Sequence, residues 1–192
     1  MMHLLRVNFG LAPVKGNYGY SFEFPMIGIA MQHSIRFGEP IDWGQIAECK
    51  EQLSLHIDEF FRDWEPLDTA IKHPFLCAGL TAVDDDLLKD LTFINCNRPL
   101  EHSIAGAMRA YPKRAAQMAE YQTDLHTGKE RVLDRAKSLD CPIFDWNYDQ
   151  MATKSSTLIS QLHQFLETPT KPEYMERALS FYDAQQHHFG GR

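Results

Sequence analysis

Residues 90–108 constrain this chain most, because they contain a short apolar run, a turn with one arginine and an apolar-periodic segment opened by a proline. This order predicts a buried strand, then Arg98 at the turn, then a helix with Pro99 at its first position. A helix start has unpaired N–H groups and the positive end of the helix dipole, so Arg98 beside it would form a phosphate site. The alternative is structural: Arg98 pairs with a carboxylate at the strand end, which is the commoner role of an arginine.

The composition favours one soluble domain comprising residues 1–192. Of the 192 residues, 44% are apolar and 23% are charged, which allows one sizeable core. The formal net charge of −7 argues against a nucleic-acid-binding protein, which normally has a basic face, so any phosphate site must be local. We find no secretory signal and no apolar stretch of membrane-spanning length. We therefore expect a cytoplasmic protein that binds neither nucleic acid nor membrane.

The cysteines and histidines do not suggest a metal site. The four cysteines are Cys49, Cys77, Cys96 and Cys141. They are widely separated, form no C-x-x-C pair and mostly have apolar neighbours, as expected of reduced, buried thiols. His187 and His188 are adjacent, so on a helix their side chains would point apart, and no third ligand is suggested. We therefore expect no bound metal.

The first half of the chain contains several predicted elements. Residues 1–9 have apolar positions at helical spacing but no N-cap residue, which predicts a short helix that is already running at Met1. Glycine and aromatic residues dominate residues 15–24, which predicts an irregular surface loop. Asp42 is expected to cap a long amphipathic helix. The expected buried residues of that helix are Ile46, Cys49, Leu53, Ile57, Phe60 and Phe61. Residues 67–74 predict a short strand closed by Pro74.

The second half predicts an alternation of helices and strands. We expect a helical turn over residues 84–89, a surface helical region over 111–139 that is interrupted near Gly128, and a strand over 142–148. A helix capped by Thr153 and a last helix from Glu173 to about His188 follow. This order predicts an α/β fold with a mainly parallel sheet flanked by helices.

Polar residues follow each of the three predicted strands. They are Lys72-His73, Asn97-Arg98 and Tyr148-Asp149. Ligands of such sheets bind at the carboxyl ends of the strands, so one shared cleft is expected to contain all three.

Three short motifs at these positions occur in a consistent order. Lys72-His73-Pro74 closes the first strand, Arg98 with Gly106 eight residues later follows the second, and Tyr148-Asp149-Gln150 follows the third. Together they resemble motifs of the cytosolic-type and related bacterial sulfotransferases, and the similarity spans most of the chain. The resemblance implies a P-loop-like α/β fold and transfer of a sulfuryl group from 3′-phosphoadenosine 5′-phosphosulfate (PAPS) to a hydroxyl or similar acceptor.

The resemblance also implies roles for individual residues. Arg98 would bind the 3′-phosphate of PAPS or of its product adenosine 3′,5′-bisphosphate (PAP), and Tyr148 would lie near the adenine. Lys72 would lie near the transferring group, where a cation neutralises the charge that grows on the leaving phosphate. The family pattern has a serine at the position of Gly106. His73 is a candidate general base because imidazole titrates near neutral pH, although a solvent-facing histidine is the commoner interpretation.

The amino terminus departs from the family pattern, which opens with a strand and a Gly-rich phosphosulfate-binding loop. Residues 1–7 resemble the helix that follows that loop. We therefore expect a truncated sulfotransferase-like domain with little activity of its own. We also expect a homo-oligomer or a remodelled sheet that covers the unpaired strand edges.

Two other functions are open. One is a non-catalytic or truncated family member with an assembly or partner-binding role. The other is an unrelated α/β hydrolase-like enzyme, which ranks last because the chain has no Gly-x-Ser-x-Gly motif and no Walker lysine motif.

Overall fold

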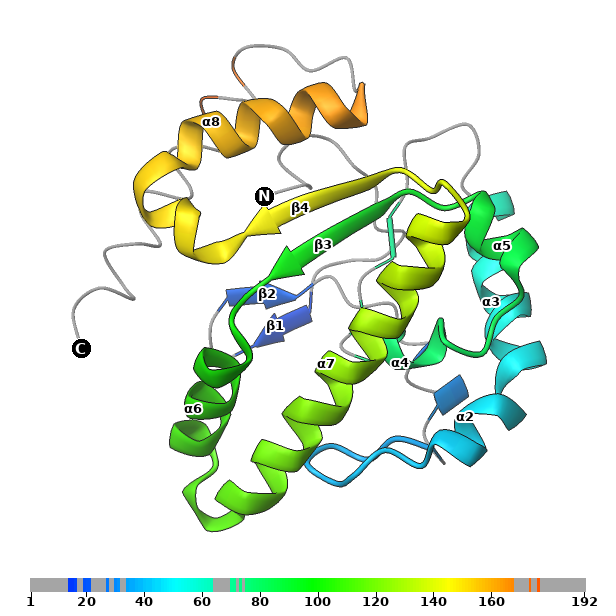
Figure 1. Ribbon diagram of the computed structural model, residues 1–192, viewed down its shortest axis with the longest axis vertical. Helices are drawn as coiled ribbons and strands as arrows, with labels where there is room; N and C mark the ends of the chain where they lie inside the picture. Colours follow the sequence, from blue (N-terminus) through cyan, green and yellow to red (C-terminus); the bar gives the residue numbers. More distant parts are fainter. Residues whose placement is uncertain are drawn as a thin grey trace.

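The computed structural model describes residues 14–16, 19–21, 27, 30–31, 34–63, 70–71, 73, 75–167, 173 and 176. In chain order the elements are β1 (Val14–Gly16), β2 (Gly19–Ser21), α2 (Trp43–Glu48), α3 (Lys50–Asp63), α4 (Leu76–Gly79), α5 (Asp85–Lys89), β3 (Phe93–Asn97), α6 (Leu100–Ala110), the 3-10 helix η2 (Pro112–Arg114), α7 (Ala115–Ser138), β4 (Ile143–Asn147) and α8 (Tyr148–Leu166). The described part of the chain is mixed α/β and mostly helical (Figure 1).

The strands β3 and β4 pair in parallel, in a register that runs from Phe93 opposite Ile143 to Asn97 opposite Asn147. Their connection contains α6, η2 and α7, as a parallel pair requires. Figure 1 shows α8 on one side of this pair and α6 and α7 on the other. The predicted α/β class and the predicted parallel pairing are therefore confirmed for these two strands, while the larger sheet of a truncated P-loop-like fold stays a prediction.

The third predicted strand, over residues 67–74, is wrong where the structure describes it. Ala70, Ile71 and His73 lie in no strand. The backbone turns instead toward α4, because His73 Nδ1 accepts a hydrogen bond of 3.1 Å from the N–H of Phe75. A side chain that bonds the backbone two residues later favours a turn over an extended strand.

The predicted irregular loop over residues 15–24 contains a β-hairpin. Residues Val14–Gly16 pair with Gly19–Ser21 in an antiparallel ladder, with Gly16 opposite Gly19. The glycines of this segment predict a loop. In the structure, two of them form the last pair of a hairpin, where glycine allows a tight connection between short strands. The helix predicted over residues 1–9 lies outside the described residues.

Asp42 caps a helix as predicted. Its Oδ1 accepts hydrogen bonds of 3.0 Å from the N–H of Gly44 and 3.2 Å from that of Gln45, an arrangement that stabilises a helix by about 1 kcal/mol. The predicted single helix is two, because α2 ends at Glu48 and α3 begins at Lys50. The predicted inner face is otherwise confirmed: Ile46, Leu53, Ile57 and Phe60 are buried, and Cys49 and Phe61 are half-buried.

The helix α7 is continuous for 24 residues, so the predicted interruption near Gly128 is wrong. A Cβ atom at Gly128 would lie 3.1 Å from Trp43 Cη2, 3.2 Å from Ala78 Cα and 3.2 Å from the carbonyl oxygen of Cys77. The glycine therefore serves close packing of α7 against α4 and α2. The same face of α7 buries Met118, Tyr121, Val132, Leu133 and Ala136, so α7 is a core helix and not only a solvated one.

Arg135 ties α7 to the segment between α4 and α5. Its guanidinium donates hydrogen bonds of 2.9–3.3 Å to the carbonyl oxygens of Leu80, Thr81 and Val83. It also forms an ion pair with Asp85. The hydrogen bond between these two side chains is the largest cause of the lowered pKa of the Asp85 carboxyl. A single side chain thus satisfies the backbone of a turn that no regular element covers.

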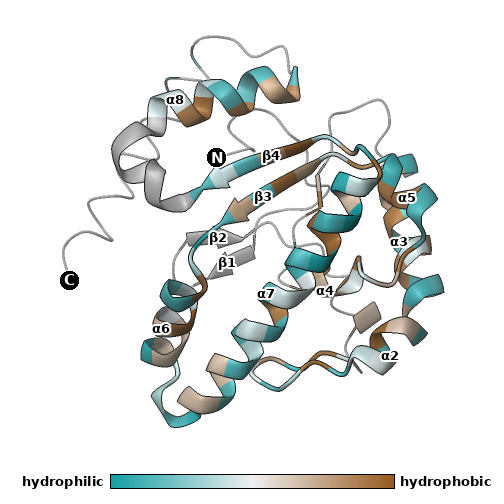
Figure 2. Ribbon diagram, viewed as in Figure 1, coloured by the Kyte–Doolittle hydropathy of each residue, from teal (hydrophilic) through white to brown (hydrophobic). Residues whose placement is uncertain are grey.

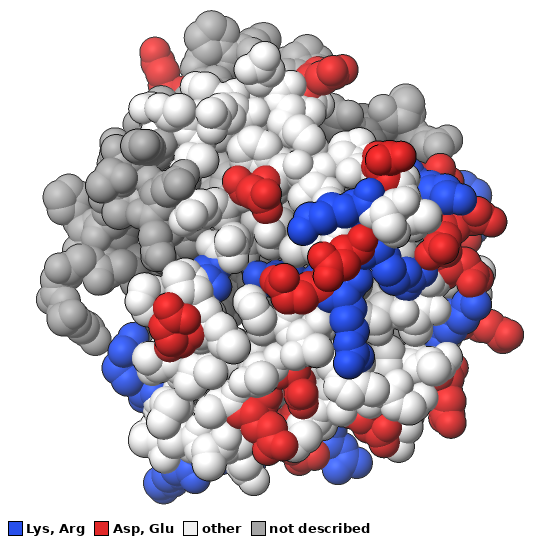
Figure 3. All heavy atoms as spheres, in the orientation of Figure 1, with Lys and Arg blue, Asp and Glu red and all other residues white. Residues whose placement is uncertain are grey.

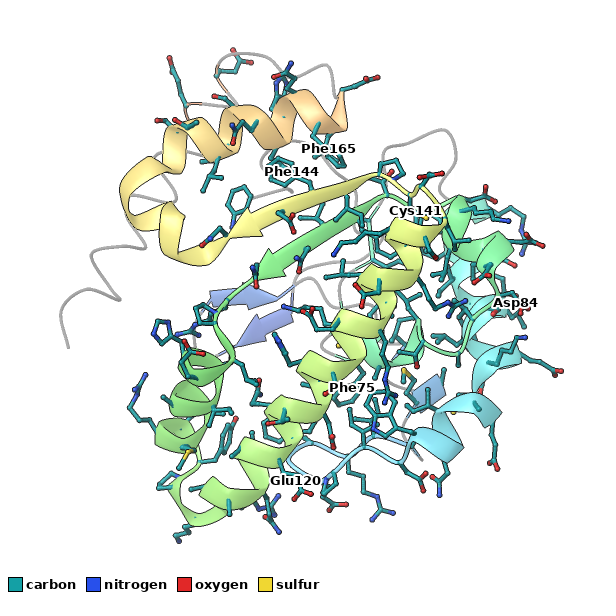
Figure 4. The ribbon with its side chains drawn as sticks, viewed as in Figure 1. Phe75, Asp84, Glu120, Cys141, Phe144 and Phe165 are labelled. Atoms are coloured by element: carbon teal, nitrogen blue, oxygen red, sulfur yellow. The ribbon has the colours of Figure 1, made fainter. Side chains whose placement is uncertain are left out.

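The helix α8 covers the other side of β4. Phe144 of β4 and Phe165 of α8 point toward each other in Figure 4, with ring centroids 5.3 Å apart. Leu158, Ile159 and Leu162 of α8 are buried. The helix begins at Tyr148, directly after β4, so the prediction that Thr153 caps it is wrong. Of the last predicted helix, only Glu173 and Glu176 are described, and both are helical.

No helix within the described ranges has both the length and the apolar character needed to cross a bilayer.

Replacing Gly128 with alanine is expected to lower the free energy of unfolding by about 1–3 kcal/mol, because the new methyl group meets backbone atoms of α4. Urea denaturation measures this change. The matched control is Gly106→Ala on α6, where the Cβ would have no neighbour closer than 3.9 Å and alanine should stabilise the helix by roughly 0.5–1 kcal/mol. Equal stabilisation by both substitutions would contradict the packing role of Gly128.

Candidate functional site

The candidate site lies at the carboxyl end of the β3–β4 pair. Asn97 and Asn147 are the last paired residues, so Arg98 and Tyr148 follow the two strands at the same edge. The helices α6 and α8 both begin at this edge. Figure 2 shows the apolar starts of the strands in brown and polar residues near their carboxyl ends in teal. Two of the three predicted polar pairs are therefore brought together by the backbone.

Arg98 is exposed and lies against α6. A Cβ atom at Gly106 would be 3.9 Å from Arg98 Nη1. Apart from the adjoining residues of α6, no other atom of the described residues would lie within 4 Å of it. The guanidinium therefore reaches the residue eight positions later, where the sulfotransferase pattern has a serine. Any serine at this position would place its hydroxyl beside Arg98.

The start of α6 adds to the positive character of this edge. The prediction that Pro99 is the first helical residue is wrong by one position, because Pro99 is the N-cap residue and α6 begins at Leu100. No side chain among the described residues caps this helix. The predicted buried strand is also only half-buried at Phe93, Ile94 and Asn95 and exposed at Cys96. The strand end is therefore accessible to a ligand, and the uncapped N–H groups of α6 point toward it.

His73 and Lys72 belong to the other predicted part of the site. Lys72 lies outside the described residues. His73 is half-buried, packs its ring against Phe75 with centroids 5.0 Å apart, and accepts the Phe75 N–H at Nδ1. This bond keeps the imidazole proton on Nε2 in the neutral form. A general-base role for His73 would require that this hydrogen bond be released.

For Tyr148, the backbone alone is described. It is the first residue of α8, which matches the prediction that this motif opens the helix after the last strand. Its role near an adenine stays a prediction.

A polar row on the α7 side of the strands was not predicted. Asn95 Nδ2 donates a hydrogen bond of 2.7 Å to Asp145 Oδ1, across the parallel pair. Two residues further, Lys129 Nζ of α7 lies 3.4 Å from Asn97 Oδ1. The sequence contains a signal for Lys129, since it occurs four residues after Leu125 and three before Val132, within the apolar stripe of α7.

The charge of the site comes from single residues. On the face drawn in Figure 3, acidic and basic side chains are mixed and form no continuous basic stripe. Arg98 directly follows β3, and Lys129 of α7 lies 3.4 Å from Asn97, the last residue of that strand. This is the local cationic character that an acidic chain can offer to one small anion.

The four cysteines are free thiols, but they differ in burial. Cys141 is buried and donates to the carbonyl oxygen of Leu88 at 3.3 Å, whereas Cys96 is exposed, contrary to the prediction of buried thiols. Burial raises the pKa of Cys77 to about 11. Within the described ranges, no group of three or more His, Cys, Asp or Glu side chains is arranged to hold a metal ion.

Comparisons with protein-family models, with curated proteins and with solved structures found no match. The resemblance to sulfotransferases therefore stays a prediction from the sequence motifs quoted above.

Cys96 is expected to be alkylated by iodoacetamide at pH 8 much faster than Cys77. The thiolate is the reactive form, and a pKa of about 11 leaves Cys77 almost fully protonated at this pH. Labelling of Cys77 should rise as the pH approaches 11. Peptide mass mapping over time measures both rates, and Cys96→Ser should remove the fast reaction. Fast labelling of Cys77 at pH 8 in the folded protein would contradict its burial.

Proposed function

We propose that this chain is a sulfotransferase-like protein that binds PAPS or PAP at the carboxyl end of the β3–β4 pair. The position of Arg98 supports this most. The residue directly follows a parallel strand, and its guanidinium lies beside Gly106 on the next helix. Arg98 and Gly106, eight positions apart in the chain, therefore lie side by side, and we call the space beside these two residues the corner. In the family pattern an arginine and a serine at this spacing hold the 3′-phosphate.

The recognition of the nucleotide follows from this corner. The 3′-phosphate accepts charge-assisted hydrogen bonds from Arg98 and lies near the uncapped start of α6, where the helix dipole favours an anion. The adenine extends toward the start of α8 and Tyr148. By the resemblance alone, the transferring group at the 5′ end would lie near Lys72.

The reaction in this proposal is a displacement at sulfur. The acceptor hydroxyl oxygen forms a bond to sulfur, the bond from sulfur to the 5′-phosphate oxygen breaks, and PAP leaves with that electron pair. The proton of the hydroxyl must pass to a base. His73 can take it only at Nδ1, and in this structure Nδ1 accepts the Phe75 N–H. The experiments below therefore test nucleotide binding.

Arg98→Ala is expected to weaken the binding of PAP by roughly tenfold or more, because a charge-assisted contact to the 3′-phosphate is lost. Isothermal titration calorimetry measures the dissociation constant. Arg109→Ala is the matched control, since Arg109 is an exposed arginine in the last turn of α6, at the opposite end of that helix from Arg98. A folded protein with no affinity for PAP would refute the proposal and favour the non-catalytic role in assembly or partner binding.

Gly106→Ser is expected to tighten PAP binding by about threefold to tenfold, because it adds a hydroxyl donor beside Arg98. Gly106→Ala is the control, since it adds the Cβ and the helix propensity without the hydroxyl. The two variants are compared by the same titration. Equal affinities of the serine and alanine variants would show that the 3′-phosphate does not lie at this corner.

A further inference from the structure

Exposed apolar side chains gather at the end of α6 that lies away from the strands. Four large apolar side chains are exposed in the described part of the chain. Three of them, Phe37 at 50%, Met108 at 39% and Tyr111 at 45%, belong to the loop before α2 and to the end of α6. The rings of Phe37 and Tyr111 meet edge to face, with centroids 5.1 Å apart. We call these two residues the aromatic pair.

The loop holds Phe37 in a defined position. The N–H of Glu39 donates a hydrogen bond of 3.0 Å to the carbonyl oxygen of Arg36, which closes a tight turn around Phe37. Gly38 has the positive φ of 77° that such a turn favours at this position. On its inner side the ring of Phe37 packs against the buried Tyr121, with centroids 5.5 Å apart. The exposed half of the ring is therefore presented from a fixed turn.

Tyr111 and the base of the loop are fixed in the same way. The N–H of Tyr111 donates to the carbonyl oxygen of Ala107 at 2.9 Å, and the Tyr111 carbonyl oxygen accepts the N–H of Arg114 at 3.0 Å. At the other end of the loop, the N–H of Ile41 donates to the carboxylate of Asp124 on α7 at 2.8 Å. Both rings thus keep their places before a partner arrives, so binding does not have to order them.

The side chains that flank the aromatic pair in the chain are mainly basic. The exposed basic neighbours are Arg36, Arg109, Lys113 and Arg114. Arg36 lies 3.9 Å from Glu39, whereas the other three form no ion pair within the described ranges. Figure 3 shows basic side chains at the lower left, where α6 ends. The nearby exposed acids are Glu39 and Glu120, the residue before Tyr121 (Figure 4). Four basic side chains therefore face two acidic ones, in a chain of net charge −7.

This combination suits a short acidic segment of another protein. Tyrosine, phenylalanine, methionine and arginine are enriched at protein interfaces, and aromatic anchors supply much of the binding energy there. Surface charges act over about 8–10 Å at physiological ionic strength. An extended anionic surface, such as a membrane or a nucleic acid, would also meet the acidic remainder of the chain, whereas a short segment meets only the local positive charge. A symmetric contact between two copies through this face would oppose like charges.

We propose that the aromatic pair binds an acidic segment of a partner protein, whose apolar side chain covers Phe37 and Tyr111 while its carboxylates pair with Lys113 and Arg114. The surface is separate from the candidate nucleotide site, because the 11 residues of α6 lie between them, about 16 Å of helix at 1.5 Å per residue. Figure 1 shows α6 running from the strand ends to this surface. The inference is independent of the proposed function.

The test starts with a phage-displayed library of random dodecapeptides that is selected on the full chain. The selected peptides should be rich in Asp and Glu and contain Phe, Trp or Leu. A fluorescein-labelled selected peptide is then titrated with the chain by fluorescence polarisation. Tyr111→Ser removes an anchor, and the double change Lys113→Glu with Arg114→Glu turns attraction into repulsion. Each should weaken binding by roughly tenfold or more, and added salt should also weaken it.

Leu55→Ser and Lys137→Glu are the matched controls. Leu55 is the fourth exposed apolar side chain, and Lys137 is an exposed lysine in the last turn of α7. Circular dichroism confirms that each variant is folded. Failure to select any peptide, or peptides whose affinity Tyr111→Ser leaves unchanged, would overturn the proposal. Cosedimentation with phosphatidylserine vesicles that Tyr111→Ser abolishes would assign the surface to a membrane instead. Self-association in sedimentation velocity that the same variant abolishes would assign it to a second copy of the chain.

Discussion

The close contact of α7 with α4 at Gly128 is the constraint on which the described structure depends. The backbone of α4 lies so near to α7 that a Cβ atom at Gly128 would be 3.2 Å from Ala78 Cα. This contact brings the helix that connects the two parallel strands against α2 and α4, and the main apolar core forms around the same helix. Arg135, two turns later, then holds the turn between α4 and α5 through its carbonyl groups. One helix thus organises elements from both halves of the chain.

This packing also determines what can lie at the strand ends. Because α7 packs against α4 at Gly128 and pairs with the start of α5 through Arg135, Lys129 approaches Asn97 from a fixed helix and not from a loop. Arg98 is less constrained, since it is exposed, but the helix that follows it begins only two residues later. The candidate site therefore combines one side chain held by the core with one that can adjust to a ligand. Such a combination suits a small anion, for which the core supplies the geometry and the surface residue supplies access.

Local signals in the sequence predict those elements whose physical cause lies in neighbouring residues. Asp42 was recognised because a cap acts on the nearest backbone N–H groups, and β3 and β4 were recognised from short apolar runs next to turns. A single glycine within a helical pattern predicts a break at Gly128. The structure has a continuous helix there because the glycine allows close contact with α4, some fifty residues away in the chain. The periodicity of residues 67–74 predicts a strand. It does not reveal that the His73 side chain accepts a hydrogen bond from the backbone N–H of Phe75, which favours a turn. At the candidate site, the strand–turn–helix pattern of residues 90–108 predicts Arg98. The spacing of Lys129 places it on the inner face of α7, but its approach to Asn97 depends on which helix faces which strand.

The parallel pairing of β3 with β4 has a consequence for how the site comes into being. Asn95 and Asp145, which bond across the pair, are 50 residues apart in the chain, and closing an unstructured loop of that length costs about 3 kcal/mol in chain entropy. Most of the intervening residues are helical, 11 in α6 and 24 in α7, so an antiparallel helical hairpin shortens the path between the strands before they meet. We therefore expect the strand edge that carries Arg98 to form after the local contacts of that hairpin.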